Sequence, residues 1–473
     1  MRRIALVGLL SAASACSLTT YNYTSCDTNA DCRDAFGFGY VCGDEGLCAE
    51  VEVEPRCERT WPVDLFTRVE DYRDAIVLGS VYDQSSDMPE TQASQLAIMQ
   101  VNDLSGLDGR AYALVECSYG EDTRLDTRTR EEAAAYTAEW LADTLGVPAL
   151  IGPATSSTAE AVYYAAAPAD AVVISPSATS PALSTIDGLT KTDEAPGLFW
   201  RTAPPDSLQG EVVAVDMLAR KTANVAVIYA TGSYGEGLAQ VFTAEFAARG
   251  GGTVTLHAFS DATERAVALG AAAAAAPDEV LFIAAESADV SAFLNAAAVQ
   301  PAYADLPIFL TDSARDEDVL LDTYATAFSL FDQVRGTAPS VPQGDVYAFF
   351  SGAYSAEFAP DVATDSVYTA HAWDAAWLAI YGVAWAAANE DGITGTGIAR
   401  GLRQLSAGTY IPINPTNWTE VRARFDEGAP VDVTGASGPL DFDPDTEETT
   451  ASIDVWEIDV DGRGFTTTYT TEP

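Results

Sequence analysis

Short apolar runs alternate with segments of helical spacing along most of the chain. The runs are Ile76–Val81, Ala111–Glu116, Val147–Ile151, Ala171–Ile174, Val225–Tyr229, Thr253–Ala258, Val280–Ala284 and Ile308–Leu310. A polar loop and then a helical segment follow each run. This alternation predicts an α/β fold with parallel sheets, because parallel strands need crossover helices, which cover both faces of the sheet.

One helical segment, Ala370–Asn389, is rich in aromatic residues. Trp373, Trp377, Tyr381 and Trp385 fall largely on one side of it. An aromatic stripe at helical spacing is more typical of a packed core than of a cofactor site. We therefore expect this helix to be structural.

Two turns rich in small hydroxyl residues follow two neighbouring predicted strands. Ile151-Gly-Pro-Ala-Thr-Ser-Ser-Thr ends the first strand, and Ile174-Ser-Pro-Ser-Ala-Thr-Ser-Pro ends the second. Ser and Thr cap free N–H groups at helix starts, and these N–H groups, together with the helix dipole, attract anions. Because neighbouring parallel strands end at the same edge of a sheet, the turns predict a pocket for one small carboxylate. The alternative is two ordinary N-caps.

The amino terminus has the layout of an export signal, predicted over residues 1–15. Arginines precede an apolar core, Ile4–Leu10, and the small residues Ser11–Ala15 end at Cys16. The apolar stretch is too short to cross a bilayer. Ala13-Ser-Ala-Cys16 resembles a bacterial lipobox, although Ala13 stands where leucine is preferred. Lipidation of Cys16 would anchor the protein to a membrane; the alternative is ordinary signal cleavage beside an incidental cysteine.

Residues 16–73 are polar and rich in cysteine, and we expect a disulfide-stapled stalk or small cap. Besides Cys16 the chain has an even number of cysteines, which suggests disulfides in an exported protein: Cys26, Cys32, Cys42, Cys48, Cys57 and Cys117. The sequence leaves their pairing open. Zinc is the alternative for the first four, but they lack a close C-x2-C pair and a neighbouring histidine.

The chain is strongly acidic, with 70 Asp and Glu against 24 Lys and Arg and a net charge of -46. Such a surface repels nucleic acid and anionic lipid, so we expect no nucleic-acid partner. The acidic residues are scattered along the chain, which argues against a single acidic binding tail. A solvated surface suited to a saline habitat is our hypothesis for this composition.

Several further motifs occur in a fixed order with the two hydroxyl turns. They are Gln95–Asn102 with Leu107–Arg110, Phe199–Gly210, Val225–Tyr229 with Ser233–Ala239, and Gly438–Pro444. In this order and spacing the chain resembles the type I periplasmic solute-binding proteins, particularly the leucine/isoleucine/valine-binding branch of ABC importers. The similarity runs from about Ala75 to the end of the chain.

The resemblance implies two doubly wound parallel-sheet lobes, joined by three crossovers and closing on a ligand by hinge motion. It assigns residues 74–198 and 316–432 to the first lobe. Residues 199–315 and 433–473 then form the second lobe.

The resemblance also implies which residues bind the ligand. Ser156 in the first turn and Ser177, Ala178 and Thr179 in the second match the positions that hold the carboxylate and amine of an amino acid. The physical chemistry agrees, because a carboxylate fits helix N-termini and hydroxyl donors. Tyr234 matches a tyrosine that the second lobe usually contributes.

The second lobe departs from the pattern of the branched-chain branch. Glu286 and Asp312 stand at the ends of two of its strands, and either could accept an ammonium group. This change leaves room for a polar, cationic or non-amino-acid solute. The loop Tyr82–Gln92 is expected to cover the pocket, with Tyr82 as a ligand contact.

The sequence contains no recognisable catalytic motif of an enzyme. Its two histidines, His257 and His371, lie in a predicted strand and in the aromatic helix. Gly232-Ser-Tyr-Gly235 is too short for a nucleophile elbow, and Asp441–Asp445 lacks the later residues of a calcium loop. We expect no catalytic residues, no metal ion and no cofactor.

These observations together predict an exported protein of the cell envelope, lipid-anchored at Cys16 in the periplasm or outer membrane. It would bind an amino-acid-like solute between its lobes for an ABC permease. The alternative is a ligand-sensing or envelope-regulatory lipoprotein of the same fold, without a dedicated permease.

Overall fold

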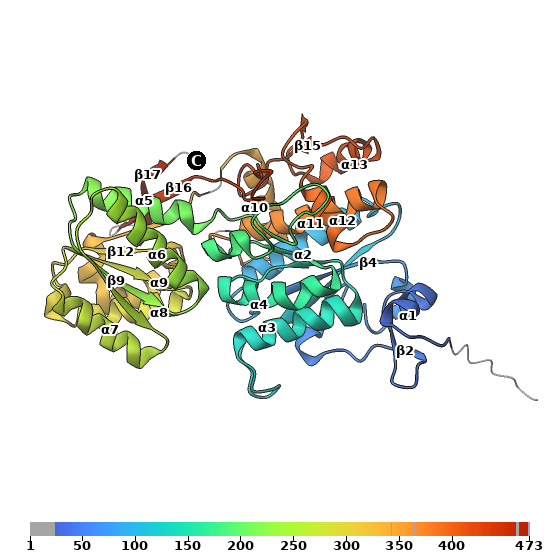
Figure 1. The fold of residues 1–473 in the computed structure, drawn as a ribbon, viewed down its shortest axis with the longest axis horizontal. Helices are drawn as coiled ribbons and strands as arrows, with labels where there is room; N and C mark the ends of the chain where they lie inside the picture. Colours follow the sequence, from blue (N-terminus) through green and yellow to red (C-terminus); the bar gives the residue numbers. More distant parts are fainter. Residues whose placement is uncertain (1–23, 342, 364–365, 460–462, 472–473) are drawn as a thin grey trace, which may run out of the picture.

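The computed structural model describes residues 24–341, 343–363, 366–459 and 463–471, which form two α/β lobes and a small N-terminal cap (Figure 1). The predicted export signal, residues 1–15, and the predicted lipidation site at Cys16 lie outside these residues. Within the described part of the chain, no helix is both long and apolar enough to span a membrane.

The first lobe is built on a six-stranded sheet in the order β3-β5-β4-β6-β7-β8. Its strands are β3 (Arg59–Trp61), β4 (Ile76–Tyr82), β5 (Tyr112–Ser118), β6 (Ala149–Ile151), β7 (Val172–Ser175) and β8 (Phe199–Arg201). All pairs are parallel except that of β3 with β5. The sheet is therefore parallel up to one antiparallel edge strand.

Helices cover both faces of the first sheet, because successive strand residues point to opposite sides. Leu78 and Leu114 join the core with α2 (Met88–Asp103), α11 (Thr369–Asn389), α12 (Gly395–Leu402) and α13 (Trp418–Asp426). Val77 and Val115 join the core with α3 (Arg130–Glu139) and α4 (Ser156–Ala166). Trp373 and Trp377 of α11 are fully buried, which confirms the structural role expected for the aromatic helix.

The second lobe is built on a seven-stranded sheet in the order β10-β9-β11-β12-β13-β16-β17. Its strands are β9 (Val225–Ala230), β10 (Val254–Phe259), β11 (Glu279–Ile283), β12 (Ile308–Leu310), β13 (Val334–Pro339), β16 (Ile453–Asp459) and β17 (Gly464–Thr471). One face carries α5 (Asp206–Ala219) and α6 (Ser233–Ala248). The other face carries α7 (Ala262–Ala274), α8 (Ser287–Ala298) and α9 (Glu317–Ala327). The predicted α/β class with two doubly wound lobes is confirmed.

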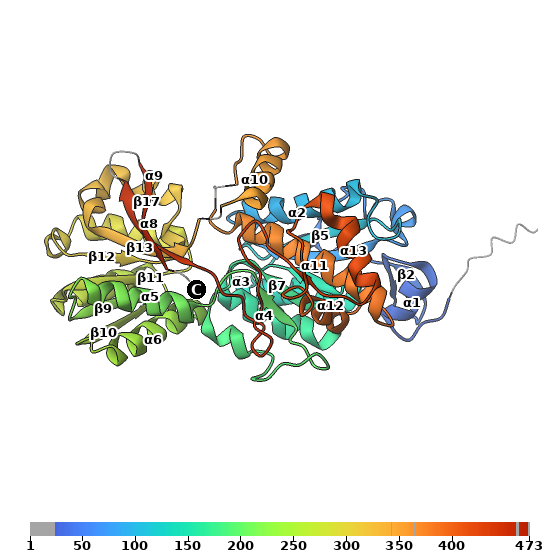
Figure 2. The ribbon, with the colours of Figure 1, turned by 90° about the horizontal axis from the view of Figure 1, so that it is seen from above.

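The chain leaves the first lobe after β8, leaves the second after β13, and returns to the second at β16. Figure 2 shows the last segment, in dark red, running back to β16 and β17 in the second lobe. In between, α10 (Asp345–Glu357) packs in the first lobe, where Phe350 and Tyr354 join its core. These three passages form the hinge between the lobes.

The expected lobe boundaries differ from those of the structure at three places. Residues 317–339, expected in the first lobe, belong to the second, because β13 pairs in parallel with β12 and α9 is the crossover between them. Residues 199–201 form β8 and pair with β7 in the first lobe. Val433, Leu440 and Phe442, expected in the second lobe, pack in the core of the first.

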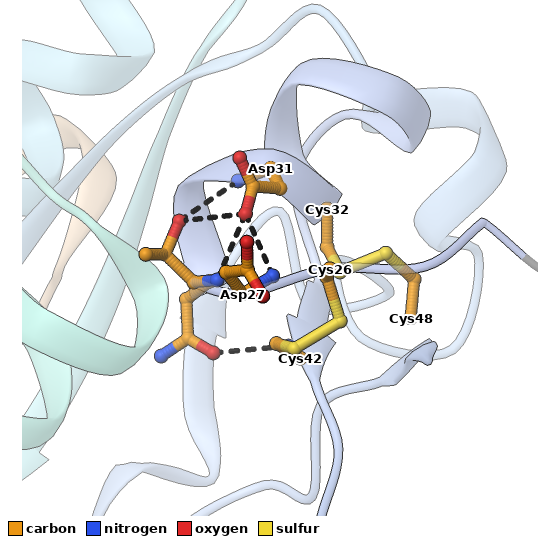
Figure 3. The surroundings of a disulfide bond; sticks show 8 residues. Cys26, Asp27, Asp31, Cys32, Cys42 and Cys48 are labelled. Atoms are coloured by element: carbon orange, nitrogen blue, oxygen red, sulfur yellow. Dashed lines mark hydrogen bonds between the residues drawn. A yellow bond between two sulfur atoms is a disulfide. The ribbon is translucent and has the colours of Figure 1, made fainter. Parts of the chain in front are cut away.

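The cysteine-rich segment is a cap docked on the first lobe. It contains α1 (Asn29–Phe36), which begins with a Thr28–Asp31 capping box, and the strand pair β1 (Tyr40–Cys42) and β2 (Cys48–Glu50). Disulfides Cys26–Cys42 and Cys32–Cys48 hold this unit together (Figure 3). The zinc alternative is wrong for these four cysteines, because each sulfur is in a disulfide.

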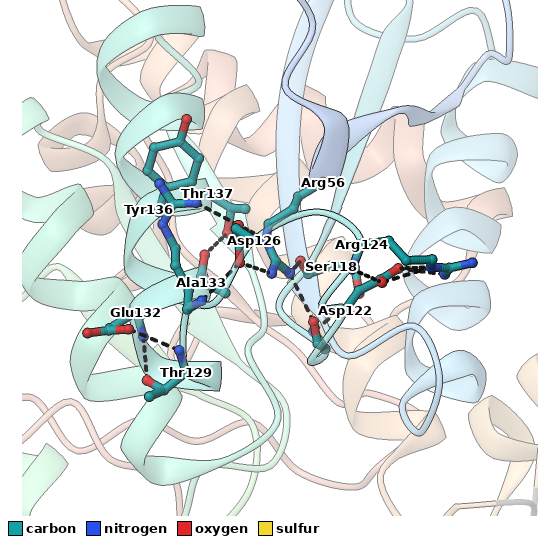
Figure 4. Close-up of polar contacts among 12 residues, drawn as sticks. Arg56, Ser118, Asp122, Arg124, Asp126, Thr129, Glu132, Ala133, Tyr136 and Thr137 are labelled. Atoms are coloured by element: carbon teal, nitrogen blue, oxygen red, sulfur yellow. Dashed lines mark hydrogen bonds and ion pairs between the residues drawn. The ribbon is translucent and has the colours of Figure 1, made fainter.

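A third disulfide and a buried arginine fasten the cap to the lobe. Cys57 is bonded to Cys117 in β5. Arg56 forms an ion pair with Asp126 at 2.7 Å and donates to the carbonyl oxygens of Ser118 and Gly120 (Figure 4). The segment is therefore a cap and not a free stalk.

Candidate functional site

A cleft of about 620 Å³ lies between the two lobes. In each lobe it opens where the strand order reverses, between β4 and β6 in the first and between β9 and β11 in the second. Ligands of doubly wound sheets bind at such switch points, beyond the carboxyl ends of the strands. The first lobe lines the cleft with the loop after β4 and the start of α4, and the second lobe lines it with residues that follow β9, β11 and β12.

The first hydroxyl turn forms the start of α4 at the cleft. Thr155 is the N-cap, and its hydroxyl oxygen accepts from the N–H of Thr158 at 3.4 Å. The N–H groups of Ser156 and Ser157 lie in the first turn, where a helix offers them no carbonyl partner. Ser156 lines the cleft, and its Oγ accepts from the N–H of Ser180 at 3.1 Å. An anion that enters here meets free N–H groups and the positive end of the helix dipole.

The second hydroxyl turn supports the first. Ser177 lines the cleft, and its Oγ donates to the carbonyl oxygen of Ala154 at 2.9 Å. Ala178 is fully buried in the core, and its N–H donates to Ser175 Oγ at 3.0 Å. Its N–H is thus already paired, and the predicted ligand contact of Ala178 is not supported. Thr179 is buried outside the cleft lining, and its carbonyl oxygen accepts from the N–H of Asp206 at 2.8 Å.

Asp312 is the centre of a buried polar cluster that joins the two lobes. Tyr234 in α6 donates its hydroxyl to Oδ1 of Asp312, and Gln209 donates to the same oxygen at 3.1 Å. Tyr368, at the start of α11 in the first lobe, donates to Oδ2 at 2.6 Å. Tyr234, Asp312 and Tyr368 all line the cleft. The structure therefore brings together two of the predicted contacts and adds Tyr368, which the sequence did not indicate.

Asp206 lies behind this cluster, at the first passage between the lobes. It is the first residue of α5 and is fully buried. Burial, and next the charge of Asp312, raise the pKa of Asp206 well above its ordinary value. A proton is therefore lost less readily from Asp206 at the hinge than from an aspartic acid in water.

Tyr82 does not reach the cleft. It is the last residue of β4, is buried in the first-lobe core, and has its hydroxyl 3.4 Å from Ser94 Oγ. The loop that follows it does line the cleft, from Ser85 to Glu90. The loop expected to cover the pocket thus lines the cleft, whereas the structure buries Tyr82 in the first-lobe core, away from the cleft lining.

Two carboxylates in this loop were not predicted from the sequence. Asp87 accepts from the hydroxyl of Tyr119 at 2.8 Å, and burial raises its pKa. Glu90 accepts a hydrogen bond from the hydroxyl of Ser366. Burial, and next the charge of Asp87, raise the pKa of Glu90 to about 7. The chain has 70 acidic residues, so composition alone could not single out Asp87 and Glu90. The only sequence feature that could have indicated them is their position after β4, which ends at a switch point.

Glu286 lies on the opposite wall as the N-cap residue of α8. Its Oε1 is 3.3 Å from Nη1 of Arg130, which begins α3 in the first lobe, and Arg130 also lies 3.4 Å from Asp83. Burial raises the pKa of Glu286 and Arg130 opposes this shift. The Arg130–Glu286 ion pair thus bridges the lobes beside the cleft.

Among the described residues, the only group that brings three metal-ligating atoms close together is Cys26, Cys32 and Cys42. These sulfurs are already in disulfides. The carboxylates of the cleft do not form such a group. The donor set of the cleft consists of hydroxyls, N–H groups and separated carboxylates, which suit a small organic molecule.

Comparison with known proteins agrees with this geometry. A family model described as the receptor family ligand binding region matches residues 89–461. The structure of LivJ, a branched-chain amino acid transporter substrate binding protein of Streptococcus pneumoniae in complex with isoleucine, is 19% identical, with a TM-score of 0.63; the match covers 84% of this chain and 100% of LivJ. A search of curated proteins gave no significant match.

Two further solved structures share the fold. The leucine binding protein LivK of Thermotoga maritima is 16% identical with a TM-score of 0.64, covering 84% of this chain and 99% of its own. A solute binding protein of an ABC transporter from R. palustris, in complex with benzoate, is 17% identical with a TM-score of 0.60, covering 84% and 97%. The chain therefore belongs to the receptor family ligand binding region family and has the type I periplasmic binding fold.

Proposed function

We propose that this protein is an exported lipoprotein that binds a small carboxylate-bearing solute, foremost an amino acid, for an ABC-type importer. The interlobe cleft carries the proposal, because α4 presents its first-turn N–H groups there beside Ser156 and Ser177. Isoleucine and benzoate, bound in two of the solved structures compared above, are both carboxylates.

The geometry supports a defined role for each wall of the cleft. The solute's carboxylate would lie at the start of α4, where N–H groups and the helix dipole stabilise negative charge. Asp312 stands on the facing wall, and Tyr234 and Tyr368 fix its position. An ammonium group between Asp312 and the start of α4 would complete the recognition of an amino acid.

Binding would couple to movement of the lobes. Each half of the recognition site lies on a different lobe, so a ligand that contacts both stabilises the closed arrangement. A permease could then distinguish the loaded from the empty protein by the relative position of the lobes.

The direct test is calorimetry on the mature chain, residues 16–473, with Cys16→Ser to prevent lipidation. After a thermal-shift screen of amino acids and small acids, Ser156→Ala should weaken the best carboxylate ligand by about tenfold, since hydrogen bonds to charged groups contribute about 1.5–3 kcal/mol. Thr419→Ala, which removes an exposed hydroxyl on α13, is the control and should leave affinity unchanged. If no amino acid or small acid binds, the proposed function is wrong.

The lipid anchor is tested separately by cell fractionation. The unaltered protein should sediment with membranes, whereas Cys16→Ser should release it into the soluble fraction of the envelope. Equal membrane association of both forms would contradict lipidation at Cys16 and leave the binding proposal intact.

A further inference from the structure

The two walls of the cleft carry charge of the same sign. Asp87 and Glu90 line it from the first lobe, and Glu286, Asp316 and Asp318 line it from the second. The walls affect each other: the charge of Asp316 contributes to the raised pKa of Glu90, and the charge of Asp87 contributes to that of Glu286. The lobes therefore face each other across carboxylates that repel.

The nearby arginines pair with Glu286 but not with Glu90 or Asp316. Arg315 lines the cleft, but Nη1 pairs with Asp454 at 3.0 Å and Nη2 donates to Thr467 at 3.1 Å. Arg130 pairs with both Asp83 and Glu286. Among the described residues, Glu90 and Asp316 thus line the cleft from different lobes, and no ion pair with a basic side chain involves either of them.

Glu90 has capacity for a ligand. It lines the cleft although its exposed fraction is only 5%. Ser366 donates one hydrogen bond to it, whereas a carboxylate can accept about four. A buried carboxylate gains most from a partner that brings both positive charge and N–H donors.

An organic cation fits this wall better than a metal ion. No three carboxylates of the described residues converge as a metal ion requires, and the cleft of about 620 Å³ has room for a molecule that reaches from one wall to the other. A basic nitrogen on a flexible chain can reach Glu90 and Asp316 while the other end of the molecule lies at α4.

We propose that the cleft selects an organic cation whose basic nitrogen lies between Glu90 of the first lobe and Asp316 of the second. The inference rests on the proposed function, because it uses the same cleft and names the class of solute. Two sources share this chemistry: basic amino acids, which also place a carboxylate at α4, and polyamines, which do not. In both, the cation relieves the repulsion between the walls, so its binding favours closure of the lobes.

Matched ligands test the charge and the carboxylate independently. L-lysine and L-arginine carry both groups, norleucine and citrulline are near-isosteres without the side-chain charge, and cadaverine and agmatine lack the carboxylate. Calorimetry on the mature chain with Cys16→Ser should show lysine or arginine binding at least about tenfold more tightly than its neutral counterpart, as expected for a charge-assisted hydrogen bond.

Substitutions of Glu90 and Asp316 then test whether these carboxylates bind the basic nitrogen of the ligand. Glu90→Gln and Asp316→Asn should each reduce the preference for the charged ligand by about tenfold. Both should fold: glutamine at position 90 can still accept the hydrogen bond from the Ser366 hydroxyl, and asparagine can replace Asp316 as the N-cap of α9. Glu420→Gln, an equal change of charge on exposed α13, should leave the preference unchanged. Circular dichroism confirms that each variant is folded.

Each outcome decides between the two proposals. If norleucine and citrulline bind as tightly as lysine and arginine, the cation inference is overturned and the proposed function stands. If cadaverine and agmatine bind as tightly as the amino acids, the cation inference stands and the carboxylate pocket is wrong. If calcium chloride alone binds and displaces lysine, the site is a metal site, and if none of the six ligands binds at millimolar concentration, both proposals are wrong.

Discussion

At the scale of single residues, Asp374 anchors the loop that precedes the last crossing of the chain between the lobes. It is buried in α11 and accepts hydrogen bonds from the N–H groups of Ala436 and Ser437, both at 2.7 Å, and from the Ser437 hydroxyl at 2.5 Å. Burial raises its pKa to about 7, against the effect of these donors. The loop before the last passage is therefore tied to the first-lobe core.

This contact requires glycine at position 435. A Cβ there would overlap the carboxylate of Asp374. We expect Gly435→Ala to lower the free energy of unfolding by about 2–3 kcal/mol, because relieving the overlap breaks buried hydrogen bonds. Urea denaturation measures the effect.

Gly352→Ala is the matched control. Gly352 lies in the exposed part of α10, and a Cβ there would meet no other atom within 4 Å. Alanine should raise the free energy of unfolding by about 0.5–1 kcal/mol through helix propensity. Equal effects of the two substitutions would show that the Asp374 contact does not constrain position 435.

At the scale of elements, the cap contributes an edge strand as well as a covering layer. Its β3 pairs with β5 of the first sheet, and Cys57–Cys117 joins positions 60 residues apart next to this pair. Cys26–Cys42 closes a separation of only 16 residues inside the cap. The first of these bonds links two units, whereas the second is local.

The two disulfides should therefore differ in their effect when removed. Replacing Cys57 and Cys117 with alanine should lower the free energy of unfolding by about 4 kcal/mol, from the loop-closure entropy of the longer link. Replacing Cys26 and Cys42 should mainly make the cap sensitive to proteolysis. Urea denaturation and limited proteolysis distinguish these results, and an intact cap without Cys26–Cys42 would contradict a stapling role for that bond.

Most strands were predictable because they carry unbroken apolar runs between polar turns; Ile308–Leu310 was placed with the bounds that the structure has. The strand β13 was missed because its residues include Arg335, Gly336 and Thr337. Gly336 lies under the indole of Trp456, where a Cβ would overlap the ring. With these residues, β13 has no recognisable apolar periodicity in the sequence. Because β13 was not predicted, the boundary between the lobes was also placed wrongly.

The candidate site was predictable where chain order determines position. Ser156 and Tyr234 follow strands at the switch points, Ser177 follows the neighbouring strand β7, and all three line the cleft. Ala178 follows β7, but its N–H already donates to Ser175 Oγ. Tyr82 is the last residue of β4, and its ring packs in the first-lobe core. Glu90 could not be selected, because only packing distinguishes a buried carboxylate from the many on the surface.

At the scale of the whole molecule, the lobes touch on one side of the cleft. Ser233 of α6 donates its N–H to Ser157 Oγ at 3.2 Å, and Ser180 Oγ donates to the carbonyl oxygen of Ser233 at 2.8 Å. The Arg130–Glu286 pair adds a charged contact between the lobes. These contacts stabilise the relative position of the lobes that the structure shows.

Removing the charged contact should favour opening. Arg130→Ala should increase the radius of gyration of the ligand-free protein and weaken ligand binding by up to about fivefold, since a partly exposed ion pair contributes up to about 1 kcal/mol. Small-angle scattering and calorimetry measure the two effects. Arg422→Ala removes the same charge from a pair on α13 and should change neither; a similar response to both would mean that net charge alone sets the opening.

The net charge of -46 should make stability depend on salt. Repulsion among surface carboxylates destabilises the folded state, and added salt screens it. We expect the melting temperature to rise by several degrees between low and high sodium chloride. A melting temperature that stays constant down to low ionic strength would contradict the saline-habitat hypothesis.

The position of β16 and β17 has a consequence for biosynthesis. β16 is the direct neighbour of β13, so the second lobe's sheet stays incomplete until Ile453–Thr471 have been synthesised. The first lobe likewise waits for α11 before its core can close. Neither lobe can therefore complete its fold until most of the chain has been synthesised, and such late folding would suit the export proposed above.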